Sequence, residues 1–359
     1  MTDTTIKVGA VCSLTGLLDT YRCQGAAAYF QRLNDQGGIN GRKVQLVLVD
    51  DQFDPSKHAA LVRRLFEQDG VFAFVSSQAP LSIHGASQYI RDKKVPIVGG
   101  DMSDVGDTWG VNPYFIPQSY IEGQSGGAIA ATYALQNENC TKIAGLAWNA
   151  PQATNWTDAW QRTLKAAGRD FDYYVKTSLA ETQFNSYISE MKGKGIDCVT
   201  LGMSGSSLVQ FSKQAHQQGF TAKRFYPMPP YDPAYISATG PAGVGTFSLL
   251  AHIPFETKTK AVQQYFADMK TYQPRTLPNS YSMLAYGAAD LFREAVARMG
   301  NNLTRANLLA TLEAFRNYDN GMLPPITIQP GPKPGGRCGN MVQLQADGTW
   351  AIRKLNLCV

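Results

Sequence analysis

Apolar blocks alternate with amphipathic segments along the N-terminal part of the chain. The apolar blocks lie at residues 7–11, 44–49, 71–75 and 95–98. Between them, apolar residues recur at helical spacing, as in Leu61, Val62, Leu65 and Phe66. Strands that are apolar almost throughout are typical of parallel sheets covered on both faces. This β-α-β-α-β-α-β order predicts an open, doubly wound α/β sheet, because right-handed crossovers place helices on both faces.

The same order starts again after residue 122. Strands are predicted at 143–148, 173–177, 198–201 and 225–228, and helices at 123–136, 154–166, 182–194 and 206–218. The chain is therefore expected to form two doubly wound, open-sheet α/β lobes.

The remaining residues contain too few strands for a third sheet. A strand is predicted at 245–253, helices at about 258–272, 280–299 and 304–317, and a hairpin from 341–345 and 350–354. We expect the helices to cover the first lobe and the hairpin to join the second. The predicted lobes are 1–118 with 254–322 and 119–253 with 323–359, joined by three hinge crossings, with a ligand cleft between them.

Composition is that of an ordinary globular protein. The 359 residues are 44% hydrophobic, and no apolar run approaches the roughly 18 residues that a membrane span needs. The first five residues are polar, so the sequence as given shows no signal peptide, and a leader removed from the precursor is the alternative. The net charge of +5 is spread along the chain without blocks of like charge, so nucleic acid is not an expected partner.

Six cysteines fall into three near pairs: Cys12 with Cys23, Cys140 with Cys198, and Cys338 with Cys358. None forms a CxxC motif, and the four histidines are not spaced as metal ligands. An even set of separated cysteines fits three disulfides and an oxidising compartment. Six buried free thiols are the alternative, and sequence alone does not fix the connectivity.

The motifs of catalysis are missing. The turn after the first strand lacks GxGxxG, no GxxxxGK[ST] occurs, and "GMSGS" at 202–206 has its second glycine one position too early for GxSxG. Asp50 and Asp51 are an acid pair, metal ligands or, more simply, residues that cap the following turn. His84 is either a base or a packed or solvated residue. We expect no enzyme, no metal and no cofactor.

Loops at the strand ends have a composition that suits binding. They read "CSLTGLLDTYR", "SSQAPLS", "GGDMSDV", "WNAPQATNW", "GMSGSS" and "PPYDP", and are rich in Ser, Thr, Gly, Gln and aromatic residues. Doubly wound sheets bind ligands beyond the carboxyl ends of their strands, where helix N-termini offer free N–H groups.

A glycine-rich turn begins the most specific pattern. "NDQGGINGRK" at 34–43 would by itself be only a helix stop, because glycine accepts positive φ. Together with "IKVGAVCSLTG" before it and "VQLVLVDDQFDP" after it, however, this segment resembles the start of the branched-chain amino acid binding proteins of ABC importers, which are type I periplasmic binding proteins. The resemblance covers essentially the whole chain.

The resemblance implies a periplasmic or extracellular solute-binding protein, with its signal peptide removed and with or without a lipid anchor. It implies a monomer whose two lobes close on a small molecule and deliver it to a membrane permease. The family's ligand contacts can be transferred to the matching loops of this sequence. They are then expected at Tyr21, Gln78, Ala79, Pro80, Asp101, Met102 and Ser103 in the first lobe, and at Trp148, Asn149, Gln152, Thr154, Ser204, Gly205 and Tyr231 in the second.

Two departures from the family pattern bear on the ligand. Ala79 and Pro80 interrupt the hydroxyl residues expected for an amino-acid carboxylate, and Asp232 is the only acid in "PMPPYDP", where a partner for the α-ammonium is expected. An unpaired buried ammonium is costly. With Trp148, Tyr231 and Met102, this favours an aromatic or other hydrophobic carboxylate or amide. An amino acid paired with Asp101 or Asp232 is the alternative, as is an aromatic set that only packs the walls.

A second function class shares this architecture. The ligand-binding domain of a sensory receptor or regulator would have the same fold, usually beside a transmembrane or output segment, which the sequence as it stands does not include. Triplets of the form N-x-S/T at Asn139, Asn155 and Asn302 would suit a glycosylated receptor, although such triplets also arise by chance.

Overall fold

The computed structural model describes residues 2, 4–15, 23–101, 112–118, 121, 123–333 and 335–359, with Asp101 and Gln152 described only in their backbone. The chain divides into two compact units. The first unit consists of residues 1–120 and 257–336, and the second of residues 121–256 and 337–359.

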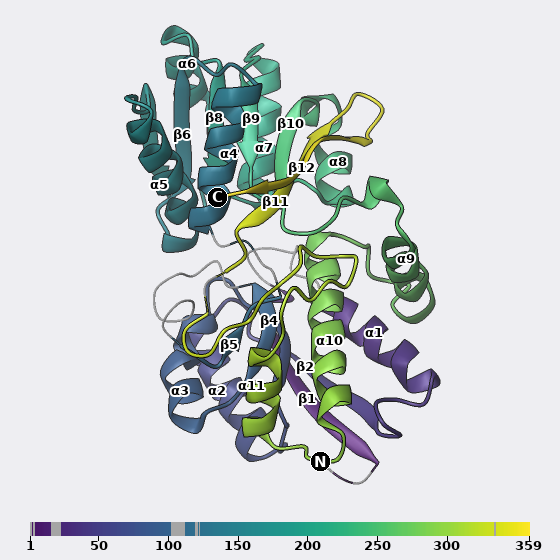
Figure 1. Ribbon diagram of the computed structural model, residues 1–359. Helices are drawn as coiled ribbons and strands as arrows, with labels where there is room; N and C mark the ends of the chain where they lie inside the picture. Colours follow the sequence, from purple (N-terminus) through teal and green to yellow (C-terminus); the bar gives the residue numbers. More distant parts are fainter. Residues whose placement is uncertain are drawn as a thin grey trace. The chain divides into compact units, whose positions relative to one another are not determined.

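The first unit is a parallel sheet with helices on both faces (Figure 1). Its order is β2-β1-β3-β4-β5, and α1 and α10 pack together on one side while α2 packs on the other. Its elements are β1 (Thr5–Cys12), α1 (Gln24–Asp35), β2 (Lys43–Asp50), α2 (Pro55–Glu67), β3 (Phe74–Gln78), the 3₁₀ helix η1 (Ile83–Ala86), α3 (Ser87–Lys93), β4 (Ile97–Asp101), β5 (Phe115–Ile116), α9 (Lys260–Tyr272), α10 (Ser280–Met299) and α11 (Arg305–Glu313).

The second unit repeats this plan and extends it. Its sheet order is β12-β11-β10-β9-β8-β6-β7, in which β6 to β10 pair in parallel, while β10 with β11 and β11 with β12 pair antiparallel. Its elements are α4 (Gly123–Asn137), β6 (Ile143–Trp148), α5 (Pro151–Ala166), β7 (Tyr173–Thr177), α6 (Asn185–Gly193), β8 (Cys198–Gly202), α7 (Gly205–Gln217), β9 (Lys223–Tyr226), α8 (Pro233–Thr239), η2 (Gly240–Gly243), β10 (Thr246–Leu250), β11 (Cys338–Leu344) and β12 (Trp350–Cys358). The short η3 (Phe255–Thr257) leads toward α9. The predicted fold class, with two doubly wound α/β sheets, is confirmed.

Local sequence signals act as expected at the start of the first unit. Asp54 caps α2, because its carboxylate accepts hydrogen bonds from the N–H groups of Ser56 and Lys57. In the turn between α1 and β2, Gly38 has φ +81°, and a Cβ at this position would lie 2.0 Å from the carbonyl oxygen of Arg42. This close approach of two backbones requires glycine.

Some predicted boundaries were wrong. The strand predicted at 71–75 begins at Phe74, where pairing to Gly9 of β1 and to Ile97 of β4 starts. The helix predicted at 81–93 is split into η1 and α3. Gly85 of η1 approaches α2 so closely that a Cβ would lie 2.2 Å from the carbonyl oxygen of Pro55. The strand predicted at 225–228 is β9, which ends at Tyr226, and β5 and α8 were not predicted.

The C-terminal helices are fastened to α1 by two buried carboxylates. Asp290 of α10 accepts hydrogen bonds from the hydroxyl of Tyr29 at 2.6 Å and from Arg293 at 2.8 Å. Asp268 of α9 accepts a bond from Arg32 of α1 at 2.6 Å. A buried carboxylate tolerates little displacement of its partners, because an unpaired buried charge is costly. These contacts explain how residues far apart in sequence complete one unit.

The segment 323–336 lies with the first unit, whereas the sequence placed it in the second. Lys333 is only 2% exposed, and its ammonium donates to the carbonyl oxygen of Pro113 at 2.7 Å and to the carboxylate of Glu313 at 2.9 Å. The N–H of Ile328 also donates to the carbonyl oxygen of Phe315. These bonds hold this segment against the rest of the first unit, which extends to residue 336.

All six cysteines form the three disulfides that the near pairs suggested, Cys12–Cys23, Cys140–Cys198 and Cys338–Cys358. The last joins the open end of the β11–β12 hairpin, which is longer than predicted. Within the described residues, no helix has both the length and the apolar character to cross a membrane.

The packing of α4 on α5 yields a stability prediction. A Cβ at Gly127 would lie 2.2 Å from the carbonyl oxygen of Trp156 and 2.8 Å from the Cβ of Ala159. We expect Gly127→Ala to lower the free energy of unfolding of the second unit by about 1–3 kcal/mol, because α5 must move. Urea denaturation followed by tryptophan fluorescence checks this, since Trp148, Trp156, Trp160 and Trp350 all belong to the second unit.

The control is Gly193→Ala at the end of α6, where an added Cβ meets nothing within 4 Å. This variant should keep or raise the stability, because alanine is the better helix former. Equal effects of the two substitutions would contradict the packing argument.

Candidate functional site

The strand order of the first unit reverses direction between β1 and β3. From β1 the chain passes to β2 on one side, and from β3 it passes to β4 on the other. The carboxyl ends of two such strands border the ligand crevice in open α/β sheets. The two ends are tied together, because the N–H of Ser13 donates to the carbonyl oxygen of Gln78 at 2.9 Å.

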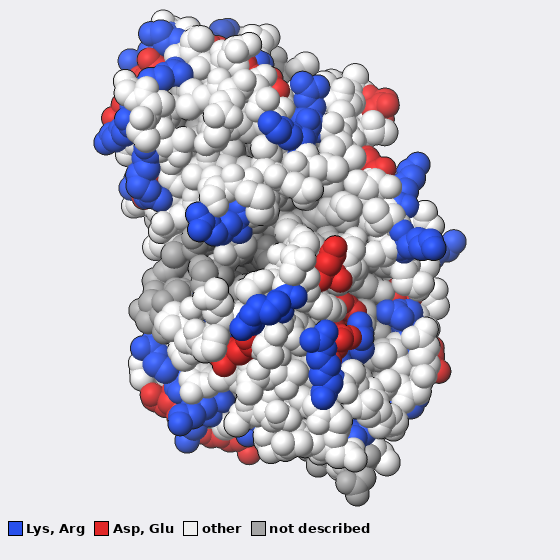
Figure 2. Space-filling model, in the orientation of Figure 1, with Lys and Arg blue, Asp and Glu red and all other residues white. Residues whose placement is uncertain are grey.

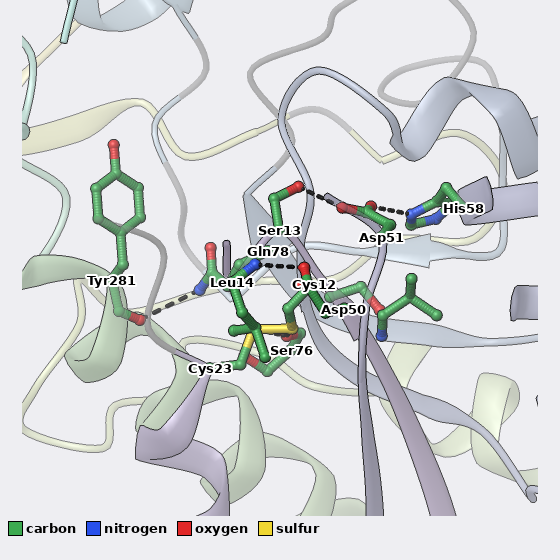
Figure 3. The surroundings of a disulfide bond; sticks show 12 residues. Cys12, Ser13, Leu14, Cys23, Asp50, Asp51, His58, Ser76, Gln78 and Tyr281 are labelled. Carbon is green, nitrogen blue, oxygen red and sulfur yellow. Dashed lines mark hydrogen bonds and ion pairs between the residues drawn. A yellow bond between two sulfur atoms is a disulfide. The ribbon is translucent and has the colours of Figure 1, made fainter. Parts of the chain in front are cut away.

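A buried carboxylate organises this end of the sheet (Figure 3). Asp51 is 0% exposed and accepts hydrogen bonds from the hydroxyl groups of Ser13 at 2.7 Å and Ser82 at 2.6 Å. It also accepts a bond from the N–H of Phe53 at 3.0 Å, and its second oxygen lies 2.7 Å from Nδ1 of His58. One carboxylate thus joins the loops that follow β1, β2 and β3 to helix α2.

The hydrogen bonds also decide the ionisation of this group. Burial by itself would raise the pKa of Asp51, but the bonds from His58, Ser82 and Ser13 outweigh burial and hold the pKa below its ordinary value. The Nε2 atom of His58 is buried and has no hydrogen-bond partner among the described residues. Because the Asp51 carboxylate can only accept, Nδ1 is the nitrogen of His58 that donates to it.

Asp50 holds the start of the loop after β1. Its carboxylate accepts hydrogen bonds from the N–H groups of Leu14 at 2.9 Å and Gln52 at 3.0 Å, and from the hydroxyl of Thr15. Burial would raise the pKa of Asp50, and these bonds lower it below the ordinary value. Both aspartates therefore act as the capping residues of the simpler interpretation.

A disulfide closes the same loop beside β3. Cys12 and Cys23 are both 0% exposed, and their sulfur atoms lie 3.4 and 3.3 Å from the carbonyl oxygen of Ser76 (Figure 3). Ser76 has φ +62°, a value that residues with a side chain adopt at an energetic cost. The backbone of β3 is therefore strained at its carboxyl end.

Two side-chain oxygen atoms in β3 have no hydrogen-bond partner in the described part of the chain. Gln78 and Ser76 are both 0% exposed, and neither Oε1 of Gln78 nor Oγ of Ser76 has a hydrogen-bond partner in the described part of the chain. Ala79 and Pro80, which follow, are also buried. Three residues carried over from the family, Tyr21, Met102 and Ser103, lie outside the described residues, and only the backbone of Asp101 is described.

In the second unit the corresponding reversal lies between β6 and β8. Trp148 ends β6 and is 6% exposed, and its Nε1–H donates to the hydroxyl of Ser207 at 3.3 Å. Ser207 in turn donates to the carbonyl oxygen of Glu181 at 2.5 Å. The indole is thus held in place from α7. The next residue, Asn149, is exposed.

The carboxyl end of β8 leads directly into α7. Ser204 is the N-cap residue, is 6% exposed, and makes no side-chain capping bond, while Gly205 follows with φ +57°. Thr154 lies in the first turn of α5 and is half-buried, and only the backbone of Gln152 is described. The candidates of the second unit therefore gather at two helix N-termini beside one strand reversal.

Tyr231 is engaged within the second unit. Its hydroxyl donates to Glu256 at 2.5 Å and accepts from the N–H of Phe255 at 2.8 Å. Its ring lies 5.7 Å from that of His252 and 5.2 Å from that of Trp350. Sequence reasoning did not find this cluster, because Trp350 lies far from the other members in the sequence and no local pattern links it to them.

Asp232, the acid considered as a partner for an ammonium group, caps helix α8. Its carboxylate accepts a hydrogen bond from the N–H of Ala234 at 2.8 Å, and the residue is 3% exposed. His84, the possible base, is exposed in η1. One group of potential metal ligands occurs in the described part of the chain, Cys140, Cys198 and Asp197, but its cysteines are joined in a disulfide and Asp197 binds the backbone of Thr141.

Comparison with known proteins identifies relatives over most of the chain. The sequence profile of the family described as periplasmic binding protein matches residues 5–349. The Leu/Ile/Val-binding protein homolog 1 of Brucella abortus (strain 2308) is 24% identical over 302 residues, which cover 83% of this chain and 79% of that protein. These matches confirm the resemblance suggested by the sequence.

Solved structures share the fold. A fatty acid ABC transporter substrate-binding protein from Thermomonospora curvata is 19% identical with a TM-score of 0.86, covering 100% of this chain and 94% of that one. An ABC transporter solute binding protein from Rhodopseudomonas palustris BisB5, in complex with 3,4-dihydroxybenzoic acid, is 19% identical with a TM-score of 0.84, covering 99% and 97%.

The Asp51 cluster gives a testable prediction. We expect Asp51→Ala to lower the free energy of unfolding by about 3 kcal/mol or more, because several buried donors lose their acceptor at once. Asp50→Ala is the matched control, since Asp50 is half-buried and its donors lie nearer to solvent, and it should cost about 1 kcal/mol. Urea denaturation measures both, and equal costs would argue against the organising role of Asp51.

The buried histidine gives a pH prediction. His252 is 0% exposed, and burial lowers its pKa from 6.5 to about 4, although a bond to the carbonyl oxygen of Ile253 opposes the shift. As the pH falls below about 6.5, the unfolded chain binds a proton at His252 that the folded chain does not. Stability should therefore fall by about 2 kcal/mol between pH 7 and pH 5.

The variant His252→Phe should remove this part of the pH dependence. His216→Gln, at an exposed position of α7, should leave it unchanged. Denaturant midpoints at pH 5, 6 and 7 provide the measurement. A profile that responds equally to both substitutions would show that His252 is not its source.

Proposed function

Because the chain belongs to the periplasmic binding protein family, we propose that it is the solute-binding protein of an ABC importer that captures a small organic molecule and delivers it to a membrane permease. Its relatives are substrate-binding proteins of transporters and not enzymes, as expected from the missing catalytic motifs. The capture step that we propose is a hinge closure of the two units on the ligand.

The repeated strand order of the two sheets carries this proposal. Both sheets contain the order 2-1-3-4-5 in their parallel part, so each has one reversal, between β1 and β3 or between β6 and β8. Gln78 stands at the first reversal, and Trp148 and Ser204 stand at the second. Open α/β sheets bind ligands at such reversals, so each unit offers a place for a ligand beside its own reversal.

The residues at these positions favour a flat or apolar ligand with a polar end. Trp148 is held edge-on by Ser207, and Ala79 and Pro80 add no side-chain donor beside Gln78. Asp232 already caps α8, which weakens the case for a free α-ammonium group at that place. We therefore propose an aromatic or other hydrophobic carboxylate or amide, with an amino acid as the second choice.

The location that we propose is the periplasm or the cell exterior. Three disulfides join all six cysteines, and such bonds form and persist in oxidising compartments. A single chain suffices for the proposed function, so we expect a monomer that meets the permease when loaded.

A thermal-shift panel of amino acids, aromatic carboxylates and fatty acids tests the proposal. A specific ligand at about one hundred times its Kd should add about 2.7 kcal/mol of stability by mass action and raise the melting temperature by a few degrees. Scattering should then show a smaller radius of gyration in saturating ligand. The stabilising compound should be recovered unchanged by mass spectrometry. Its chemical conversion, or a panel without any stabilising compound, would contradict the proposed function.

A further inference from the structure

Gln78 has a fixed side-chain orientation at the end of β3. Its backbone is held on two sides, by pairing with Asp101 of β4 and by the N–H of Ser13. Its side-chain Nε2 lies 3.2 Å from the carbonyl oxygen of Tyr281, in the first turn of α10. Figure 3 shows the amide between these elements, with its oxygen turned away from Tyr281.

The chemistry of that contact decides which end of the amide faces Tyr281. A backbone carbonyl oxygen can only accept, so the amide nitrogen must face it and donate. Oε1 of Gln78 is then fixed as an acceptor that points elsewhere, and it has no donor in the described part of the chain. A buried acceptor without a donor is unfavourable, and a group that supplies one gains that free energy.

Two of the neighbouring hydroxyl groups are already used as donors, because Ser13 and Ser82 donate to Asp51. The hydroxyl oxygen of Ser77 accepts from the N–H of Val11 at 3.4 Å. Pro80 has no N–H to offer. Beside Gln78, Ser76 alone retains a side-chain oxygen without a partner in the described chain. Among the described side chains at the end of β3, the groups without a hydrogen-bond partner are therefore one acceptor, Oε1 of Gln78, and one hydroxyl, that of Ser76, rather than a row of donors suited to a bare carboxylate.

We propose that Gln78 selects ligands that present a hydrogen-bond donor to it, such as a phenolic hydroxyl, an amide N–H or an ammonium group. This inference rests on the proposed function and specifies the chemistry of one part of that site. A ligand with a carboxylate would direct a different group toward Gln78, because two acceptors without a shared proton repel each other. Sites built to bond a substrate hydroxyl or N–H discriminate strongly against analogues that lack it.

Matched ligand pairs test the proposal by titration calorimetry. The pairs are 3-hydroxybenzoate and 4-hydroxybenzoate against benzoate, benzamide against benzoate, and leucine against 4-methylpentanoate. For the pair whose skeleton fits the protein, we expect the member with the donor to bind at least about tenfold more tightly. Equal affinities, or a preference for the member without the donor, would overturn the proposal. This comparison uses the unmodified chain and does not depend on a variant that folds.

Substitution then locates the effect. Gln78→Met keeps the length of the side chain and removes the acceptor, so the preference should fall to about twofold or less while the donor-free ligand keeps its affinity. Gln88→Met is the control, because Gln88 is exposed on α3 and its side-chain amide donates to Asp92 on the same helix. It should keep the full preference.

Two further outcomes distinguish a failure of the inference on Gln78 from a failure of the proposed function. If Gln78→Met raises the melting temperature and leaves every affinity unchanged, the side chain serves the core alone and the inference is overturned. If no compound of any pair or of the wider panel binds the unmodified chain, the proposed function itself fails, and the inference fails with it.

Discussion

A parallel sheet brings the carboxyl ends of all its strands to one edge, and this constraint governs both units of the molecule. Each crossover must pass over a face of the sheet, so a reversal of strand order leaves two neighbouring ends whose connections diverge. The chain makes such a reversal between β1 and β3 and again between β6 and β8. Loops of different sequence can then supply chemistry at two equivalent places, without any change in the sheets that hold them.

Each unit is also completed by parts of the chain that are far apart in the sequence. The helices after residue 257 belong with strands formed before residue 101, and the hairpin after residue 337 extends the second sheet (Figure 1). Ion pairs with a buried partner help to specify how these distant segments pack, among them Arg32 with Asp268 and Lys333 with Glu313. In Figure 2, by contrast, Lys and Arg lie scattered among Asp and Glu on the visible face, so surface charge does not single out one docking region there.

Apolar periodicity was enough to predict the fold class, because covered parallel strands leave a strong pattern, and capping signals such as Asp54 located helix starts. Boundaries were less predictable where tertiary contacts decide them, as at Gly85, whose approach to Pro55 splits a predicted helix, and at Lys333, whose buried bonds hold residues 323–336 to the first unit. For the candidate site, the sequence predicted which loops take part but not which of their residues contact one another. Asp51 was read as a capping residue, but its bonds to Ser13 and Ser82 depend on three loops that meet only in the folded chain.

Two neighbouring polar groups at the end of the first sheet illustrate how framework and recognition differ. The carboxylate of Asp51 has a donor for each oxygen, so it fixes the loops around it and leaves nothing over for a ligand. The amide of Gln78 has one end fixed by Tyr281 and the other without a donor in the described chain. A saturated buried group contributes stability, whereas an unsaturated one costs it unless something else supplies the bond. The proposed role of Gln78 in recognition depends on this difference, because rigid surroundings hold its unsatisfied acceptor at the strand reversal, two residues after the strained Ser76.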